Sequence, residues 1–351
     1  MKTIKKEIAG RMKWYSVQAL MLLAVIVCTA CDDVIYDDEG DCDPHYYVNF
    51  VYDMNMLYSD AFAKQVNSVD LYVFDAQTGK YITHFEDEGD ALGSGDYKMS
   101  LDNLAPGKYQ FVAWCGLANN NHDFVVPANI AQLEDLTCTM ARAYDAQVAY
   151  SNRNLHALFH GSLVVDLPNK EGDHLYTVKL TKNTNNVNLS LNHMAEELDP
   201  ERFDIKLTDA NGLLAYDNSL LADQSIEYRP WSLRSGSVDV DESGKQASFL
   251  QMEFSTSRLM ANHDLRISII DKQENKTIFS IPLVKWALQL RSANYANMDD
   301  QEYLDREDEY NLMVFLANNN DDNGQEESEN WMAMQIVING WHVIDNGDVQ
   351  F

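Results

Sequence analysis

The segment "LAPGKYQF", residues 104–111, places a Pro-Gly turn directly before an alternating run of polar and apolar residues. Proline fixes φ at about −65°, and we expect Gly107 to supply the positive φ of a tight turn. Tyr109, Phe111 and Ala113 follow at two-residue intervals, so they share one face of a half-buried strand. The segment therefore predicts a tight turn that leads into a β-strand.

The same two-residue alternation recurs along the chain, and turn-forming Gly, Pro, Asn and Asp residues separate the runs. This pattern is typical of an all-β sandwich. Helical patterning is confined to residues 192–200 and 283–308, and in the second segment Asp299 and Glu302 form an N-terminal capping pattern. The alternating apolar positions are Val48, Phe50 and Tyr52; Val69, Leu71 and Val73; Val187, Leu189 and Leu191; Phe203, Ile205 and Leu207; and Met332, Met334, Ile336 and Ile338.

The length of the chain allows two domains. It has 351 residues, of which 46% are hydrophobic, enough for more than one core. The polar segment "PNKEGD", residues 168–173, separates two strand-like runs, and we place a domain boundary there. We therefore predict an all-β fold with two tandem β-sandwich domains, residues 44–168 and 169–351, the second with one or two short helices.

The first 30 residues have the features of an export signal. A basic stretch precedes an apolar run of about a dozen residues, whereas a membrane-spanning helix needs roughly 20. Thr29 and Ala30 are small and precede Cys31, which predicts a lipoprotein signal peptide over residues 1–30 and lipidation of Cys31. A simple cleaved signal is the alternative. Residues 31–43 then form an acidic tether, which resembles the signals that send lipoproteins of Bacteroidetes-type bacteria to the outer face of the outer membrane.

The acidic charge of the chain limits its partners. Asp and Glu number 55 against 26 Lys and Arg, so the formal net charge is −29. Such a surface repels phosphate backbones, and we predict no nucleic-acid partner.

Three cysteines follow the predicted lipidation site, namely Cys42, Cys115 and Cys138. In an oxidising compartment at most one pair of them can form a disulfide. A bond between Cys115 and Cys138 is possible, because both lie in strand-like segments of one predicted domain. Free buried thiols are the alternative.

Motifs for catalysis and for metal binding are absent from the sequence. It has no Gly-x-Ser-x-Gly elbow, no phosphate-binding Gly-rich loop and no His-Glu-x-x-His, so we predict no enzyme and no cofactor. His156 and His160 are four residues apart, which suits a metal only on a helix, and their surroundings indicate a strand. We therefore assign no catalytic residue and no metal site. Five tryptophans could form a sugar-binding platform, although core packing is the simpler interpretation: Trp114, Trp231, Trp286, Trp331 and Trp341.

Four long segments resemble the FimB-type family of fimbrial anchor lipoproteins of Bacteroidales, which belong to type V fimbriae. The turn at residues 104–111 likewise resembles the Leu-x-Pro-Gly-x-Tyr turn of transthyretin-like domains. The resemblance implies two transthyretin-like or Ig-like sandwiches, an outer-membrane lipid anchor at Cys31 on the cell surface, and attachment of a fimbria through donated β-strands. The four segments are "DCDPHYYVNFVYDMNMLYSDAFAKQVNSVDLYVFD" (41–75), "STSRLM" (255–260), "DQEYLDREDEYNLMVFL" (300–316) and "INGWHV" (338–343).

The resemblance also makes the first strand important. In the stalk subunits of that family an Arg-directed protease removes this strand and opens a groove for a neighbour. Here no Lys or Arg lies between Cys31 and Lys64, and the next arginine is Arg142. We expect the chain to keep its first strand and to act as a terminal subunit that donates a strand to a fimbrillin stalk subunit. The retained strand carries Tyr46, Val48, Phe50 and Tyr52.

Two questions stay open at this point. The sequence does not identify the donated strand, because only ten residues follow Trp341 and an edge strand of the second domain could serve instead. A surface glycan-binding lipoprotein is the alternative function.

Overall fold

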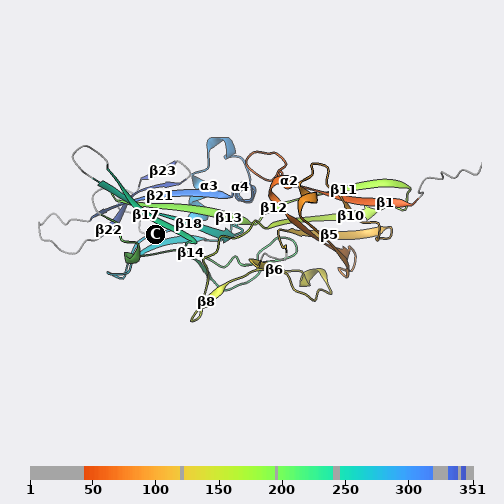
Figure 1. The fold of residues 1–351 in the computed structure, drawn as a ribbon, viewed down its shortest axis with the longest axis horizontal. Coiled ribbons are helices and arrows are strands. Elements are labelled where there is room, and N and C mark those ends of the chain that lie inside the picture. Colours follow the sequence, from red (N-terminus) through yellow and green to blue (C-terminus); the bar gives the residue numbers. More distant parts are fainter. Residues whose placement is uncertain are drawn as a thin grey trace, which may run out of the picture. The chain divides into compact units, whose positions relative to one another are not determined.

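The computed structural model describes residues 43–118, 122–193, 197–239, 246–318, 331–338 and 341–344. The predicted signal peptide, Cys31 and all of the tether except Asp43 lie outside these residues. Strands dominate the described part of the chain (Figure 1), and the predicted all-β class is confirmed.

Two sheets enclose a first hydrophobic cluster. One has the strand order β11-β1-β4 and the other β12-β10-β5-β2-β3. Val48 from the first sheet and Val69, Phe111 and Phe159 from the second are fully buried in the same cluster, so the sheets form a sandwich. The strands are β1 (Pro44–Val51), β2 (Ser68–Asp75), β3 (Tyr81–Glu88), β4 (Met99–Ser100), β5 (Gly107–Cys115), β10 (Phe159–Leu167), β11 (Gly172–Lys179) and β12 (Thr181–Lys182).

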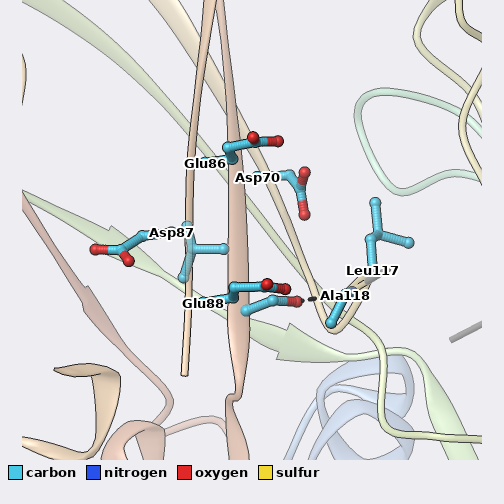
Figure 2. Close-up of a pocket in the computed structure, with 8 residues that line it drawn as sticks. Asp70, Glu86, Asp87, Glu88, Leu117 and Ala118 are labelled. Carbon is cyan, nitrogen blue, oxygen red and sulfur yellow. Dashed lines mark hydrogen bonds between the residues drawn. The ribbon is translucent and has the colours of Figure 1, made fainter. Parts of the chain in front are cut away.

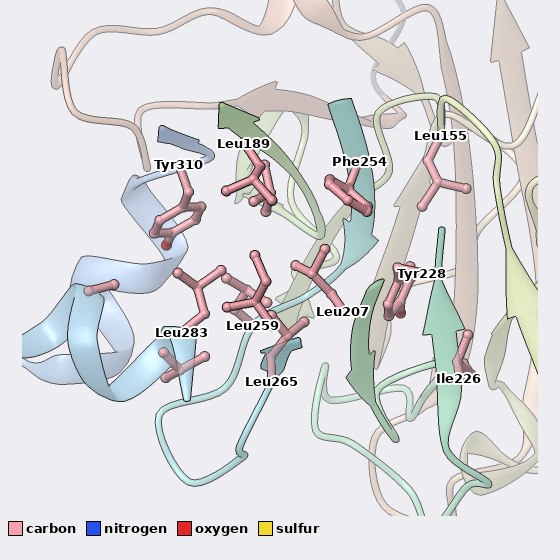
Figure 3. Close-up of a cluster of buried hydrophobic side chains, with 14 of the residues drawn as sticks. Leu155, Leu189, Leu207, Ile226, Tyr228, Phe254, Leu259, Leu265, Leu283 and Tyr310 are labelled. Atoms are coloured by element: carbon pink, nitrogen blue, oxygen red, sulfur yellow. The ribbon is translucent and has the colours of Figure 1, made fainter. Parts of the chain in front are cut away.

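Two six-stranded sheets enclose a second cluster, with the orders β17-β18-β13-β21-β22-β23 and β20-β19-β14-β16-β9-β8. Figure 3 shows Leu189 and Phe254 of the first sheet in one apolar cluster with Leu207 and Tyr228 of the second. The strands are β8 (Ala143–Asp145), β9 (Val148–Ser151), β13 (Thr184–His193), β14 (Phe203–Asp209), β16 (Ile226–Tyr228), β17 (Ser232–Asp239), β18 (Gln246–Ser257), β19 (Arg266–Asp271), β20 (Lys276–Pro282), β21 (Glu309–Asn318), β22 (Trp331–Ile338) and β23 (Trp341–Ile344).

Pairing between strands crosses the boundary predicted at residues 168/169. Strand β9 precedes that boundary, yet it pairs in parallel with β16, with Ala149 opposite Ile226. A small sheet, β15-β7-β6, likewise pairs Thr139 with Leu213. The physical reason is burial, because Phe124 and other apolar residues of the segment before β10 pack in the second cluster. These strands are β6 (Phe124–Val125), β7 (Cys138–Met140) and β15 (Leu213–Leu214).

The segment 104–111 forms the predicted strand but not the predicted turn. Gly107 is the first residue of β5, and it is not among the glycines that have a positive φ. A Cβ at this position would lie 3.4 Å from the ring of Tyr109, an ordinary contact distance. The Tyr109 side chain lies over Gly107, and its hydroxyl donates a hydrogen bond to the Ala105 carbonyl, 2.9 Å away. Tyr109 therefore fixes the entry into β5.

The second helical prediction is confirmed and the first is wrong. Residues 283–308 contain α3 (Leu283–Gln289) and α4 (Asp300–Arg306), separated by a 3₁₀ turn. Asp299 caps α4, since its Oδ1 accepts hydrogen bonds from the backbone N–H groups of Gln301 and Glu302. Strand β13 instead extends into the segment 192–200, through His193.

The remaining helical elements are short. They are α2 (Phe62–Gln65), η1 (Asp90–Gly93), η2 (Leu133–Asp135), η3 (Pro200–Arg202) and η4 (Ala293–Tyr295). Among the residues that the structure describes, no helix is both long enough and apolar enough to cross a membrane.

We predict that Tyr109→Phe lowers the free energy of unfolding by about 1 kcal/mol, because it removes one hydrogen bond and leaves the ring in place. Urea denaturation measures this change. Tyr58→Phe is the matched control, because the Tyr58 ring is exposed and packs under the Arg306 guanidinium, a contact that phenylalanine keeps. Equal stability of Tyr109→Phe and the unchanged chain would contradict the role given to this hydroxyl.

Candidate functional site

The first strand occupies the middle of its sheet. Strand β1 lies between β11 and β4, with Tyr47 opposite Ser100 and Val48 opposite Met99. Backbone hydrogen bonds extend the pairing on both sides: the Leu101 N–H donates to the Tyr46 carbonyl, and the Leu180 N–H donates to the Val51 carbonyl. Removal of β1 would therefore leave two strands without their shared partner, and it would open a groove.

That groove would be apolar, because the side chains that β1 directs into it are buried among apolar residues. Tyr46, Val48, Phe50 and the following Tyr52 are all at most 3% exposed. Full burial of one such side chain contributes about 1.5–3 kcal/mol, so the four together contribute about 6–12 kcal/mol. This is comparable with the whole stability of a typical domain, about 5–15 kcal/mol. The predicted set of inward-facing residues thus coincides with the buried face of β1.

Aromatic contacts fix the end of β1. The Phe50 ring stacks on Phe62 with centroids 5.8 Å apart, and the Tyr52 ring meets Phe159 edge-on at 4.9 Å. At the other end the Tyr46 hydroxyl donates to the Pro168 carbonyl, 2.7 Å away. These contacts come from α2, from β10 and from the segment after β10, so β1 is packed against several parts of the chain.

The backbone after β1 is held by a residue from far along the chain. The Arg306 guanidinium, at the end of α4, donates to the carbonyls of Asp53 and Asn55 at 3.1 and 3.3 Å. The same guanidinium lies 4.4 Å from the centre of the Tyr58 ring. Arg306, which lies in the last quarter of the sequence, therefore helps to fix the backbone that follows the first strand.

We call the six-stranded sheet β17-β18-β13-β21-β22-β23 the larger sheet, because its strands contain more residues than those of the other six-stranded sheet. Its two edge strands could pair with another chain. Strand β23 pairs only with β22, with Trp341 opposite Ile338, and β17 pairs only with β18 among the described strands. An edge strand offers unpaired backbone groups to a partner strand. The structure thus leaves both edges as candidates for the strand contact.

The disulfide predicted between Cys115 and Cys138 is not formed in the structure. Both are free, buried thiols. They belong to different hydrophobic clusters, Cys115 to the first and Cys138 to the second. Burial raises the pKa of both thiols, and the nearby Asp70 carboxylate raises it further, so both remain protonated and unreactive.

His156 and His160 do not form a metal site. The His156 Nδ1 lies 2.7 Å from the buried Asp123 carboxylate, in the loop before β10. His160 lies on β10, where its Nε2–H donates to the Tyr216 carbonyl at 2.8 Å and its ring packs 4.7 Å from that of Trp114. Each imidazole therefore has a separate structural contact, as the strand-like surroundings indicated.

The tryptophans do not form a platform in the described residues. Trp114 is fully buried and Trp231 and Trp286 are half-buried. The side chains of Trp331 and Trp341 lie outside the described residues. For Trp114, core packing is the correct interpretation.

A fold of sandwiches with a buried first strand and open edge strands suits a subunit that joins others by strand pairing. The comparisons identify the family. The chain belongs to the family described as fimbrillin-A associated anchor proteins Mfa1 and Mfa2, whose model matches residues 38–347. The predicted membership of a fimbrial anchor family is confirmed.

Several relatives agree with this assignment. The minor fimbrium anchoring subunit Mfa2 of Porphyromonas gingivalis is 24% identical over 316 residues, 89% of each chain. A crystal structure of an adhesin candidate from Bacteroides thetaiotaomicron is 34% identical with a TM-score of 0.74, covering 88% of this chain and all of the other. A second structure from that species, of a candidate polysaccharide-binding protein, is 31% identical with a TM-score of 0.71 and the same coverage.

We predict that Phe50→Ala lowers the free energy of unfolding by about 3–5 kcal/mol, because it leaves a cavity among the rings of the first cluster. Asn49→Ala is the matched control on the opposite face of β1. It should cost only about 1 kcal/mol, because the Asn49 side chain makes one hydrogen bond with Thr177. Urea denaturation measures both, and equal costs would contradict the packing described for β1.

We further predict a pH-dependent stability that arises from His160. Burial lowers the pKa of its imidazole from 6.5 to about 4, so below pH 6.5 the unfolded chain takes up a proton that the folded chain does not. Stability should fall as the pH decreases from about 6.5 to about 4, by roughly 3 kcal/mol from this residue. His160→Gln should flatten that part of the curve of unfolding free energy against pH. Parallel curves for the two proteins would contradict the assignment.

Proposed function

We propose that this protein is the base of a fimbria, fastened to the outer membrane by a lipid on Cys31. Membership of the fimbrial anchor family supports the first part. The signal-like residues 1–30, the small residues before Cys31 and the acidic tether support the second. Acyl chains contribute about 0.8 kcal/mol for each buried CH₂, so several chains on one cysteine would hold a filament firmly.

The observation that carries the proposal is the buried, central position of β1. No basic residue between Cys31 and Lys64 offers an Arg- or Lys-directed protease a site ahead of this strand. A chain that keeps β1 keeps its lipid and fills its own groove. It can donate a strand to the next subunit but cannot accept one in its own filled groove. This makes it a terminal subunit and limits the length of the fimbria.

The partner in this arrangement is a fimbrillin stalk subunit. We propose that the contact is a main-chain strand pairing at an edge of the larger sheet, at β23 or at β17. Strand addition suits a filament base, because backbone hydrogen bonds supply affinity and alternate side chains supply register. The role is structural and needs no catalytic residue.

A second candidate is glycan binding at the cell surface. A groove of about 390 Å³ lies on the polar face of the larger sheet, lined by Asn188, Ser190, Gln251 and Asn311 among others. Amide groups of this kind can donate to and accept from sugar hydroxyls, and a structurally similar protein is described as a candidate polysaccharide-binding protein. Among the described residues that line the groove, none is aromatic and able to stack on a sugar ring, so we rank this function second.

We predict that cells in which Cys31→Ala replaces the native chain release fimbriae into the medium, because the filament loses its lipid anchor. Immunoblotting of cell and medium fractions for the stalk subunit measures the release. Cys42→Ala is the matched control, because this cysteine lies in the same acidic segment but not behind the small residues Thr29 and Ala30. Fimbriae that stay on the cells in both variants would overturn the anchor role of Cys31.

A further inference from the structure

Three potential metal ligands meet near the edge of the five-stranded sheet. Strand β3 forms that edge and pairs with β2, and the register places Asp70 opposite Glu86 and Tyr72 opposite His84. Alternate residues of a strand share a face. Asp70, His84 and Glu86 therefore project from one face of two neighbouring strands.

The side chains of Asp70 and Glu86 line a pocket of about 250 Å³, and His84 lies next to both of them. One ligand atom from each of Asp70, His84 and Glu86 can be chosen so that all three lie within 4.8 Å of one another. Figure 2 shows the carboxylates of Asp70, Glu86 and Glu88 on the same side of the strands, whereas Asp87 points the opposite way. The pocket thus collects negative charge from two strands at one point.

The imidazole of His84 is held in place but lacks a hydrogen-bond partner at Nε2. Its ring stacks on that of Tyr72 with centroids 4.4 Å apart and an angle of 21° between the planes. The Nε2 atom is buried and lies 3.3 Å from Asp70 Oδ1, yet it has no hydrogen bond of acceptable geometry in the described residues. A buried nitrogen in this condition is costly unless something else binds it.

Apart from His84 beside Asp70, the two carboxylates have no basic partner among the described residues. No Lys or Arg of the described part of the chain forms an ion pair with Asp70 or Glu86. A bound cation would compensate the charge of both carboxylates and satisfy the imidazole together.

We propose that Asp70, His84 and Glu86 bind a divalent transition-metal cation, of which Zn²⁺ fits best. One imidazole nitrogen and two carboxylate oxygens form a mixed donor set that suits zinc, whereas Ca²⁺ and Mg²⁺ prefer oxygen ligands alone. The pocket leaves room for water as a fourth ligand, and Glu88 lines the same pocket. The cation fastens the edge strand β3 to β2.

The test is calorimetric titration of ZnCl₂ into the full chain, purified in detergent and treated with EDTA before dialysis. We expect one zinc ion per chain at this site and no comparable binding of CaCl₂ or MgCl₂. His84→Gln should weaken zinc binding at least about tenfold, since it removes the only nitrogen ligand. His45→Gln is the matched control, because His45 also lies 3.2 Å from an aspartate, Asp102, but is not part of a three-ligand cluster.

A second measurement guards against a variant that fails to fold. Glu86 is exposed, so Glu86→Gln should leave the circular dichroism spectrum unchanged. Co²⁺ bound to the unchanged chain should give visible absorption bands that Glu86→Gln weakens or loses. Equal zinc affinity in the unchanged chain, His84→Gln and His45→Gln, or no zinc binding at all, would overturn the proposal. Neither result would affect the proposed anchoring role, which is read from the release of fimbriae.

Discussion

The insertion of β1 between β11 and β4 is the interaction on which the rest of the structure depends. Its backbone hydrogen bonds complete a sheet, and its apolar face completes the first cluster. Without β1 the other sheet of that sandwich would expose Val69, Phe111 and Phe159 to water. The first strand is therefore a structural part of the sandwich, and in the proposed function it also connects this body to the lipid on Cys31.

The region around β1 is also tied to distant parts of the chain by polar contacts. Arg306 holds the backbone after β1, and Lys182 pairs with Asp308 at 2.5 Å just after α4. Deeper in the protein Arg258 forms a two-pronged ion pair with Asp305 at 2.7–2.8 Å. Such charge pairs are stabilising only when their geometry is good, and removing one partner leaves a buried charge. The segment 300–308 thus connects the first strand to the second cluster.

The edges of the sheets differ in what they offer a partner. Strand β3 ends with Glu86, Asp87 and Glu88, and charged edges discourage pairing with another chain. The edges at β17 and β23 lie in the other sandwich, on its larger sheet. A cation at Asp70 and Glu86 would reduce the repulsion between these carboxylates of β2 and β3. The remaining charges of β3 would still discourage another strand from pairing at that edge. The distribution of charge therefore favours strand contacts at the larger sheet.

Much of the fold could be read from the sequence because it depends on local periodicity. Alternation at two-residue intervals placed β1, β2, β13 and β14 correctly, and the capping pattern at Asp299 placed α4, since both signals come from neighbours in the chain. The helix expected at residues 192–200 was wrong, because pairing with two neighbouring strands extends β13 to His193. The predicted lipoprotein signal and the absence of Lys and Arg between Cys31 and Lys64 likewise come from the sequence by itself.

Only the tertiary structure decided which segments meet. Local pattern could not show that β9 joins the sheet of the second cluster, nor that Cys115 and Cys138 lie in different clusters. The sequence likewise could not show that Asp70, His84 and Glu86 lie close together, because their proximity follows from the antiparallel register of β2 and β3. Sequence alone determined where many of the strands form, since strand formation depends largely on neighbouring residues. The partners of each strand depend on long-range burial and register, which no local pattern contains.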